Sequence, residues 1–519
     1  MPPKNTKPSS EITERRFSDS NMSPRNSTNT DDQATSTGYS TREDRTTYDE
    51  ETQESRAQQA PLSEEVDPEL EAFFKKYGEI NISYIEPPPH SPWFTRPYAL
   101  NYFHKGTLYR TRHERTSGKL ELFLDLVYVG IAANLASNAV SGADGVSFLK
   151  FLLVFIPPWT IWSDLKDFMN YYFNDDIIQR GYVLWILALL ITYDNNCEFV
   201  DDLEDNTAIL TCVVTYFLAR VTLSGLLWFY SLYIHEHRTQ MRLYGTSLVI
   251  TSSCWFFILL IKTNWGRCIF AALMFILEQT IFCLSVHPWT KKKLGLEYST
   301  ALNIEHEDER FQGFVIIAIG EFLYSLVADS PLKFGWNGKL AKGFALLIDA
   351  FIFLGIYLHK DGCLKATHAL RRSAFTAILY IYLHFPLIAS LLIVGDAGVD
   401  LSKIKNGYIE GEEELGVLFF FHTGILVALV SLTCLASLDQ DRDDHSDHYV
   451  PRFGRISLRI PTGILIFGLT WAHDKLTIVQ ILWMDCVFLT LLYFFEFTVM
   501  NPFNFNIKSH MGLVNVQEA

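Results

Sequence analysis

The chain divides into a polar first part and a long apolar remainder. Residues 1–65 contain almost no aliphatic runs and are rich in Ser, Thr, Asp, Glu, Arg and Gln. Such a segment cannot bury enough apolar surface to offset the entropy of ordering it. From about residue 120 one apolar run follows another, which a soluble domain could not hide from water. The pattern predicts a disordered N-terminal tail followed by an all-α integral membrane domain.

Twelve segments are apolar enough to be expected to cross a membrane as helices, which takes about 20 residues each. They are 120–140, 147–169, 178–194, 207–234, 243–261, 266–286, 309–328, 341–358, 374–395, 415–437, 456–472 and 476–499. The chain is accordingly divided into a disordered cytosolic tail (1–65), a cytosolic pre-membrane segment (66–119), a polytopic membrane domain (120–500) and a cytosolic C-terminal tail (501–519). In the pre-membrane segment a short amphipathic helix is predicted, because Asp67 can cap it, Pro68 suits its first turn and Gly78 can end it.

Lys and Arg residues gather before the first span and in alternate later loops. They include Lys105, Arg110, Arg112, Arg115 and Lys119, and further on Arg238, Arg242, Lys291–Lys293, Lys360, Lys365, Arg371, Arg372, Arg452, Arg455 and Arg459. Because cytosolic loops carry the excess of positive charge, both termini are predicted to be cytosolic. Much of the net charge of −15 lies in the tail and two acidic loops. No basic stripe interleaved with aromatic residues indicates a nucleic-acid partner.

Two of the predicted spans begin alike. Glu121-Leu-Phe-Leu-Asp-Leu-Val and Glu309-Arg-Phe-Gln-Gly-Phe-Val share Glu, Phe and Val at the same offsets, and six spans separate them. Two six-helix halves of the same orientation would be a parallel repeat of the kind found in transporters. Three matched positions are compatible with such a repeat and equally with coincidence.

Three stretches resemble signatures of the bacterial low-temperature-requirement protein A family. Glu121-Leu-Phe-Leu-Asp-Leu-Val-Tyr-Val resembles its opening pattern E-L-F-F-D-L-V-F-V, with Leu124 and Tyr128 in place of Phe. The second runs from Glu309 to Glu321, where Phe322 follows instead of a small residue, and the third from Tyr380 to Ala389. The signature positions are Glu121, Phe123, Asp125, Glu309, Arg310, Phe311, Gly320, Glu321, His384 and Pro386.

The resemblance covers roughly residues 110–500 and implies a multi-pass membrane protein. The family is named for a growth phenotype and not for a reaction, so the resemblance implies an architecture and leaves the function open. The long Ser/Thr-rich tail is not part of the family core, and it suggests a eukaryotic member, such as a fungal one.

Ionisable residues inside the predicted spans are costly to desolvate, so each is a candidate for function. The candidates for an ion, proton or substrate pathway are Asp125, Glu321, Arg220, His384, Glu278 and Asp349. Asp125 and Glu321 would coordinate a cation or exchange protons, and Arg220 would neutralise one of them. His384, two residues before Pro386, could relay protons near neutral pH. In the alternative interpretation these groups form static ion pairs that fix the packing of the helices.

The sequence therefore favours a transporter or ion-conducting protein that uses buried carboxylates in its first and seventh spans. One alternative is a membrane-embedded sensor or scaffold, with a tail that a kinase phosphorylates. The other is a lipid-modifying enzyme, which ranks lower because no nucleophile–base pair or His-rich box is recognisable. No cofactor or metal is expected, and His235-Glu-His237 is interpreted as part of a solvated loop. The expected partners are the lipid bilayer and a small ion or small-molecule substrate.

Overall fold

The computed structural model describes residues 80–500, apart from 113–114, 116–117, 329–331, 333–334, 361, 364–365, 443–447 and 449. The predicted disordered tail, the predicted helix from Asp67 to Gly78 and the C-terminal tail at 501–519 lie outside the described residues.

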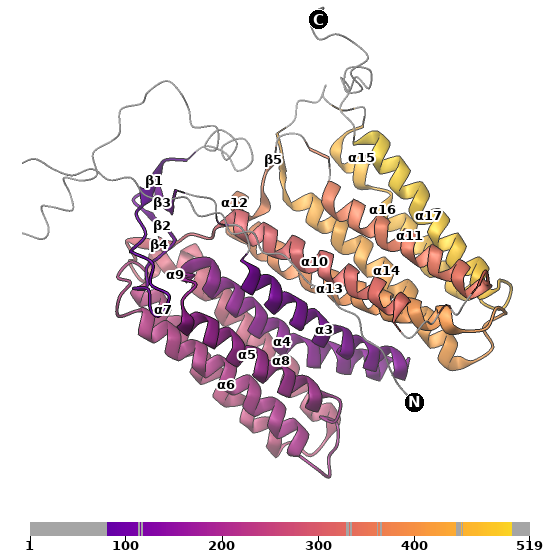
Figure 1. Cartoon of the computed structure of the whole chain (residues 1–519), viewed down its shortest axis with the longest axis horizontal. Helices are drawn as coiled ribbons and strands as arrows, with labels where there is room; N and C mark the ends of the chain where they lie inside the picture. The colour runs from indigo at the N-terminus through magenta and orange to yellow at the C-terminus, as the bar shows by residue number, and fades with distance from the viewer. Residues whose placement is uncertain are drawn as a thin grey trace, which may run out of the picture. The chain divides into compact units, whose positions relative to one another are not determined.

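Helices dominate the described part of the chain, and eleven of them there are long and apolar enough to cross a membrane. They are α3 (Lys119–Gly142), α4 (Gly145–Tyr172), α5 (Ile177–Cys197), α6 (Thr207–Tyr230), α7 (Arg238–Cys254) with the 3-10 helix η1 (Trp255–Leu260), α8 (Asn264–Val286), α10 (Ile304–Val327), α11 (Gly338–His359), α13 (Ala374–Lys403), α14 (Glu412–Leu438) and α17 (Ile478–Val499). The all-α membrane architecture is thereby confirmed (Figure 1).

The span expected at 456–472 is a broken one. It consists of α15 (Arg452–Ile456), α16 (Arg459–Leu469) and the 3-10 helix η2 (Thr470–Ala472). Arg459, at the start of α16, contacts Glu496 near the end of α17. The start of α17 lies at the opposite end, where its first backbone N–H donates to the Gly407 carbonyl in the loop before α14. The segment therefore runs antiparallel to α17. Arg459 also donates to the carbonyl of Lys360 at the end of α11, and Lys360 pairs with Asp308 at the start of α10. Since the neighbouring His306 contacts Glu121 at the start of α3, the start of α3 and the end of α17 lie at the same end of the helices.

A small sheet, which the sequence did not predict, combines three strands that precede α3 with one strand that precedes α10. Its strands are β1 (Ile82–Ile85), β2 (Asn101–His104), β3 (Thr107–Thr111) and β4 (Tyr298–Thr300), in the order β1-β3-β2-β4, with β1 and β3 parallel and the other pairs antiparallel. Lys105 and Gly106 both have positive φ angles, as the tight turn between β2 and β3 requires. Since β4 ends just before α10, the sheet ties the pre-membrane segment to the start of α10. The short elements α9 (Pro288–Lys293), α12 (Ala369–Arg372), β5 (Ala366–Thr367) and β6 (Gln440–Asp441) lie in loops.

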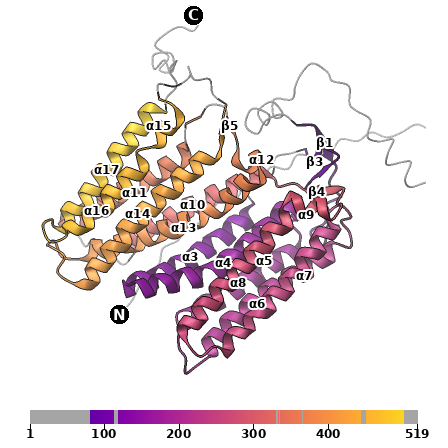
Figure 2. The same ribbon diagram turned by 180° about the vertical axis from the view of Figure 1, so that it is seen from behind.

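Three helices, α3, α10 and α13, form the middle of the membrane domain. Helix α10 packs against α3 and α13, and α3 also packs against α13. On one side of them, α4 to α8 pack among themselves, and on the other side α14 packs on α13 and α16 while α11 packs on α17 (Figures 1 and 2). We call α4–α8 the first group and α11, α14, α16 and α17 the second group.

Candidate functional site

The first turn of α10 is a run of buried polar residues that face four different elements. Asn303 caps the helix by accepting a hydrogen bond from the backbone N–H of His306. The contacts of the run are Glu305 with Arg110 on β3, His306 with Glu121 on α3, Glu307 with Lys166 on α4, and Asp308 with Tyr380 on α13. One turn later Arg310 contacts Asp125 on α3. We call residues 305–310 with these partners the α10 junction.

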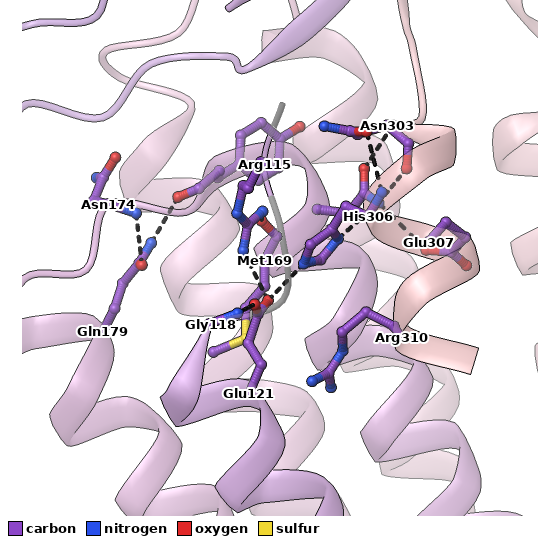
Figure 3. Close-up of polar contacts among 12 residues, drawn as sticks. Arg115, Gly118, Glu121, Met169, Asn174, Gln179, Asn303, His306, Glu307 and Arg310 are labelled. Carbon is purple, nitrogen blue, oxygen red and sulfur yellow. Dashed lines mark hydrogen bonds and ion pairs between the residues drawn. The ribbon is translucent and has the colours of Figure 1, made fainter. Parts of the chain in front are cut away.

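Glu121 accepts hydrogen bonds from three donors. The Arg115 guanidinium lies 2.7 Å from Oε1 and His306 Nε2 lies 2.9 Å from the same oxygen, while the Gly118 backbone N–H lies 2.7 Å from Oε2. Figure 3 shows Arg115 and His306 converging on this carboxylate. Arg115 also donates to the Met169 carbonyl, which joins the start of α3 to α4. Burial lowers the pKa of Arg115, and the neighbouring Glu121 carboxylate opposes this shift.

The hydrogen bonds fix the tautomer of His306. The amide nitrogen of Asn170 donates to its Nδ1 over 3.2 Å, and the same side chain accepts from the Asn303 backbone N–H. Because Nδ1 accepts, the ring proton is on Nε2, and Nε2 donates to Glu121. The imidazole is therefore neutral. Because it is hydrogen-bonded to Asn170 on α4 and to Glu121 on α3, His306 links the first turn of α3 to α4.

Asp125 is fully buried and is held through one oxygen. Arg310 and the indole N–H of Trp162 each lie 2.7 Å from Oδ1, whereas Oδ2 has no hydrogen-bond partner among the described residues. Nearby, Lys166 pairs with Glu307 and with Asp167, and its ammonium lies over the Phe311 ring at 4.6 Å. The α10 junction is thus a set of neighbouring ion pairs, which the aromatic side chains of Trp162 and Phe311 contact.

A second polar cluster lies inside the first group. Asp164 on α4 pairs with Arg220 on α6 and accepts from the Tyr244 hydroxyl at 2.5 Å. Glu278 on α8 accepts from the Tyr216 hydroxyl at 2.5 Å and from the indole of Trp255 at 3.1 Å. Together these residues place two carboxylates and one guanidinium in the interior of the group.

Three cavities are arranged along α4, α6 and α8 with this cluster in the middle one. The first, about 470 Å³, is lined by residues 146–157 of α4, 209–216 of α6 and 264–275 of α8. The second, about 20 Å³, is lined by Asp164, Arg220, Tyr244 and Glu278 among others. The third, about 60 Å³, is lined by residues 164–172 of α4, 223–227 of α6 and 282–286 of α8. Because the order is the same on all three helices, the cavities form a series, which we call the cavity series.

The structure separates several residues that the sequence analysis had grouped. The expectation that Arg220 neutralises Asp125 or Glu321 was wrong, because the helix packing brings Arg220 against Asp164. Glu321 lies eleven residues beyond Arg310 on α10, about 16 Å along the helix. It is half-buried, and its carboxylate has no hydrogen bond or ion pair with a described residue.

His384 is placed between aromatic rings. Its Nδ1 lies 2.7 Å from the Tyr380 carbonyl and its Nε2 lies 3.2 Å from the Tyr357 hydroxyl, and it stacks on Phe311. Pro386 lies within α13, which continues as a helix past it. Asp349 lies buried in the second group, and no N–H or O–H group among the described residues donates to its carboxylate oxygens.

The matched positions of the two similar spans differ in their surroundings. Glu121 is buried and Glu309 is exposed, whereas Phe123 is exposed and Phe311 is buried. The three-residue match therefore does not mark equivalent environments, and a six-helix repeat stays a prediction.

Sequence reasoning missed several residues that the structure places at these sites. They are Asp164, Lys166, Asn170, His306, Glu307 and Asp308. Their signal was present in the sequence, because three ionisable residues at 164, 166 and 167 interrupt an apolar span. His237 was also misinterpreted as solvated: it is buried, and its Nδ1 lies 2.9 Å from the Tyr172 hydroxyl.

Comparison with known proteins agrees with the architecture. The family described as bacterial low temperature requirement A protein (LtrA) matches residues 116–495. No curated protein matches the chain. The matched region includes all of α3, every membrane helix from α4 to α16 and most of α17. It also includes most of the α10 junction and the whole cavity series. The chain belongs to the LtrA family of multi-pass membrane proteins.

Proposed function

We propose that the protein conducts or transports protons or a water-sized cation across the membrane along the cavity series. The observation that carries the proposal is the order of the three cavities, which is the same along α4, α6 and α8. The charged cluster lies where the series is narrowest. A path for an ion needs polar groups at that place, since a dry apolar constriction would be too costly for a charge.

The size and charge of the middle cavity favour a small cation. A volume of about 20 Å³ is close to the space that one water molecule needs. Asp164 and Glu278 bring two negative charges when ionised, and Arg220 brings one positive charge. The excess of carboxylates favours a proton or a cation over an anion.

Hydrogen bonds of Tyr216 and Tyr244 give the path its gates. Tyr216 lines the first cavity and donates to Glu278, which lines the second. Tyr244 lines the second and third cavities and donates to Asp164. Rotation of either hydroxyl would release a carboxylate oxygen toward the neighbouring cavity. In this proposal Asp125 holds α3 to α10 through Arg310 and stands beside the path.

The same end of the helices that carries the sheet and the α10 junction is proposed to face the cytosol. Lys291–Lys293 on α9, Arg238 at the start of α7 and Arg115 before α3 belong to this end, and cytosolic loops are rich in Lys and Arg. The first cavity then opens toward the opposite side, near Asp201 and Trp265.

Flux in proteoliposomes tests the proposal. Purified protein is reconstituted with a proton-, sodium- or potassium-sensitive dye inside, and the gradient of the matching ion is imposed. Glu278→Gln is expected to lower the flux at least tenfold, whereas the matched carboxylate change Glu321→Gln leaves it unchanged, because Glu321 lines none of the three cavities. Flux that persists in Glu278→Gln but disappears in Glu321→Gln would move the path to α10. Monodisperse elution of each variant shows that it is folded.

A further inference from the structure

Three polar residues are buried together in the second group, away from the α10 junction. They are Asp349 on α11, Asp485 on α17 and His422 on α14, and each is fully inaccessible. Asp349 and Asp485 interact electrostatically, and Cys486 lies beside Asp349. The proposed function uses none of these residues.

A chain of hydrogen bonds shows how many protons the pair of Asp485 and His422 holds. The Thr470 hydroxyl donates to the Phe467 carbonyl at 2.8 Å, so its oxygen is left to accept from Nδ1 of His422, which lies 2.7 Å away. With Nδ1 protonated, Nε2 of a neutral imidazole can only accept. Asp485 Oδ2 lies 3.0 Å from Nε2. A proton must therefore lie between them, either on the Asp485 carboxyl group or on an imidazolium.

The remaining carboxylate oxygens of the cluster are the two of Asp349 and Oδ1 of Asp485. No N–H or O–H group among the described residues donates to either carboxylate oxygen of Asp349 or to Oδ1 of Asp485. The thiol of Cys486, a weak donor, lies beside Asp349. The titratable groups that interact with the two acids are the acids themselves, His422 and Cys486, with no Lys or Arg among them. An ionised carboxylate with only a thiol as donor and with no cation is very costly to bury, so the neutral acid is the stable form of Asp349.

We propose that Asp349, Asp485 and His422 form a proton-binding site in the second group, separate from the cavity series. Asp349 holds one proton, and the Asp485–His422 pair holds a second. The contact between Nε2 of His422 and Oδ2 of Asp485 requires a proton between the two atoms, so the proton is the ligand that fits. Because α11, α14 and α17 each supply one residue, the charge state of the site affects how these helices pack.

Infrared difference spectroscopy tests the site directly, because a protonated carboxylic acid has its own carbonyl stretching band. Membranes containing the full chain are compared between acidic and alkaline buffer, in water and in heavy water. The wild-type protein is expected to show buried protonated carboxyl bands that persist at neutral pH. Asp349→Asn should remove one of them, and His422→Gln should shift another, because it changes the partner of Asp485.

The control is Asp400→Asn, which should leave these bands unchanged, since Asp400 is partly exposed and pairs with Lys403. Unchanged bands in Asp349→Asn and His422→Gln would overturn the proposal. So would bands that disappear on addition of sodium or potassium at constant pH, because the site would then bind that cation. The infrared bands are read without flux, so a failure of the conduction proposal is distinguishable from a failure of this one.

Discussion

Arg310 and Asp125 are 185 residues apart in the sequence, and their side chains meet 2.7 Å apart in the interior of the protein. Both are fully buried, and Nε and Nη1 of Arg310 have no further partner among the described residues. The pair is therefore held by one hydrogen bond and by the exclusion of water. It joins α3 to α10.

Removal of either partner of this pair is expected to destabilise the protein strongly. Asp125→Asn leaves a buried guanidinium without its counter-charge, which typically costs about 3–5 kcal/mol. Arg310→Gln leaves the carboxylate alone and should cost a similar amount. The double variant should be more stable than the sum of the two losses, because neither charge is then left unpaired. Thermal unfolding in detergent measures all three variants, and strictly additive losses would contradict a direct pair.

His237 makes the stability depend on pH. Burial lowers its pKa to about 3, and the nearby Lys291 adds to this shift. An unfolded His takes up a proton near pH 6.5, so between these values the unfolded chain binds more protons. The free energy of unfolding should therefore fall as the pH drops below about 6.5, by at most about 1.4 kcal/mol per pH unit.

The His237→Gln variant checks this dependence. Its amide can still accept from the Tyr172 hydroxyl, but it cannot be protonated. The difference in melting temperature between about pH 7 and about pH 5 should be smaller in the variant than in the wild-type protein. Equal differences in the two proteins would show that other groups set the acid sensitivity.

A natural thiol probes the first cavity. Cys268 lines this cavity near the start of α8 and is half-buried. A charged thiol reagent that does not cross membranes is expected to modify Cys268 only from the non-cytosolic side, and to reduce the flux severalfold by narrowing the cavity. Cys268→Ala should conduct normally and be insensitive to the reagent. Modification from the cytosolic side alone would reverse the proposed orientation.

The close approach of α10 and α13 gives a matched pair of glycine variants. A Cβ atom at Gly395 would lie 2.9 Å from the Cβ and 3.3 Å from the Cα of Phe322, whereas one at Gly320 would meet nothing within 4 Å. Gly395→Ala should force the two helices apart and cost about 1–3 kcal/mol. Gly320→Ala should leave the stability unchanged or raise it by up to about 1 kcal/mol. Equal melting temperatures for the two variants would contradict this packing.

The sequence predicted the helices well, because about 20 apolar residues are a strong signal for a membrane span. It also identified Asp125, Arg220, Glu278 and Asp349 as buried ionisable residues. Their pairing could not be predicted from the sequence, because several acids in the predicted spans could pair with Arg220. Only the packing of α4 against α6 brings Asp164 to it.

Other features had little local signal. The sheet was missed because its strands have three to five residues each and β4 lies far from the others in the sequence. The first turn of α10 was missed because Glu305 to Asp308 look like a solvated, acidic helix start. Their burial comes from partners on four other elements, which no local pattern contains.

The buried run at the start of α10 also has a consequence for biogenesis. Arg110, Glu121 and Lys166 all precede α10 in the chain, so they have left the ribosome by the time this helix is made. Tyr380, the partner of Asp308, is synthesised later. Three of the four polar contacts are therefore available to α10 as it enters the membrane, and the fourth awaits α13. The helices from α10 onward are therefore assembled against earlier helices in which the partners of Glu305, His306 and Glu307 are already in place.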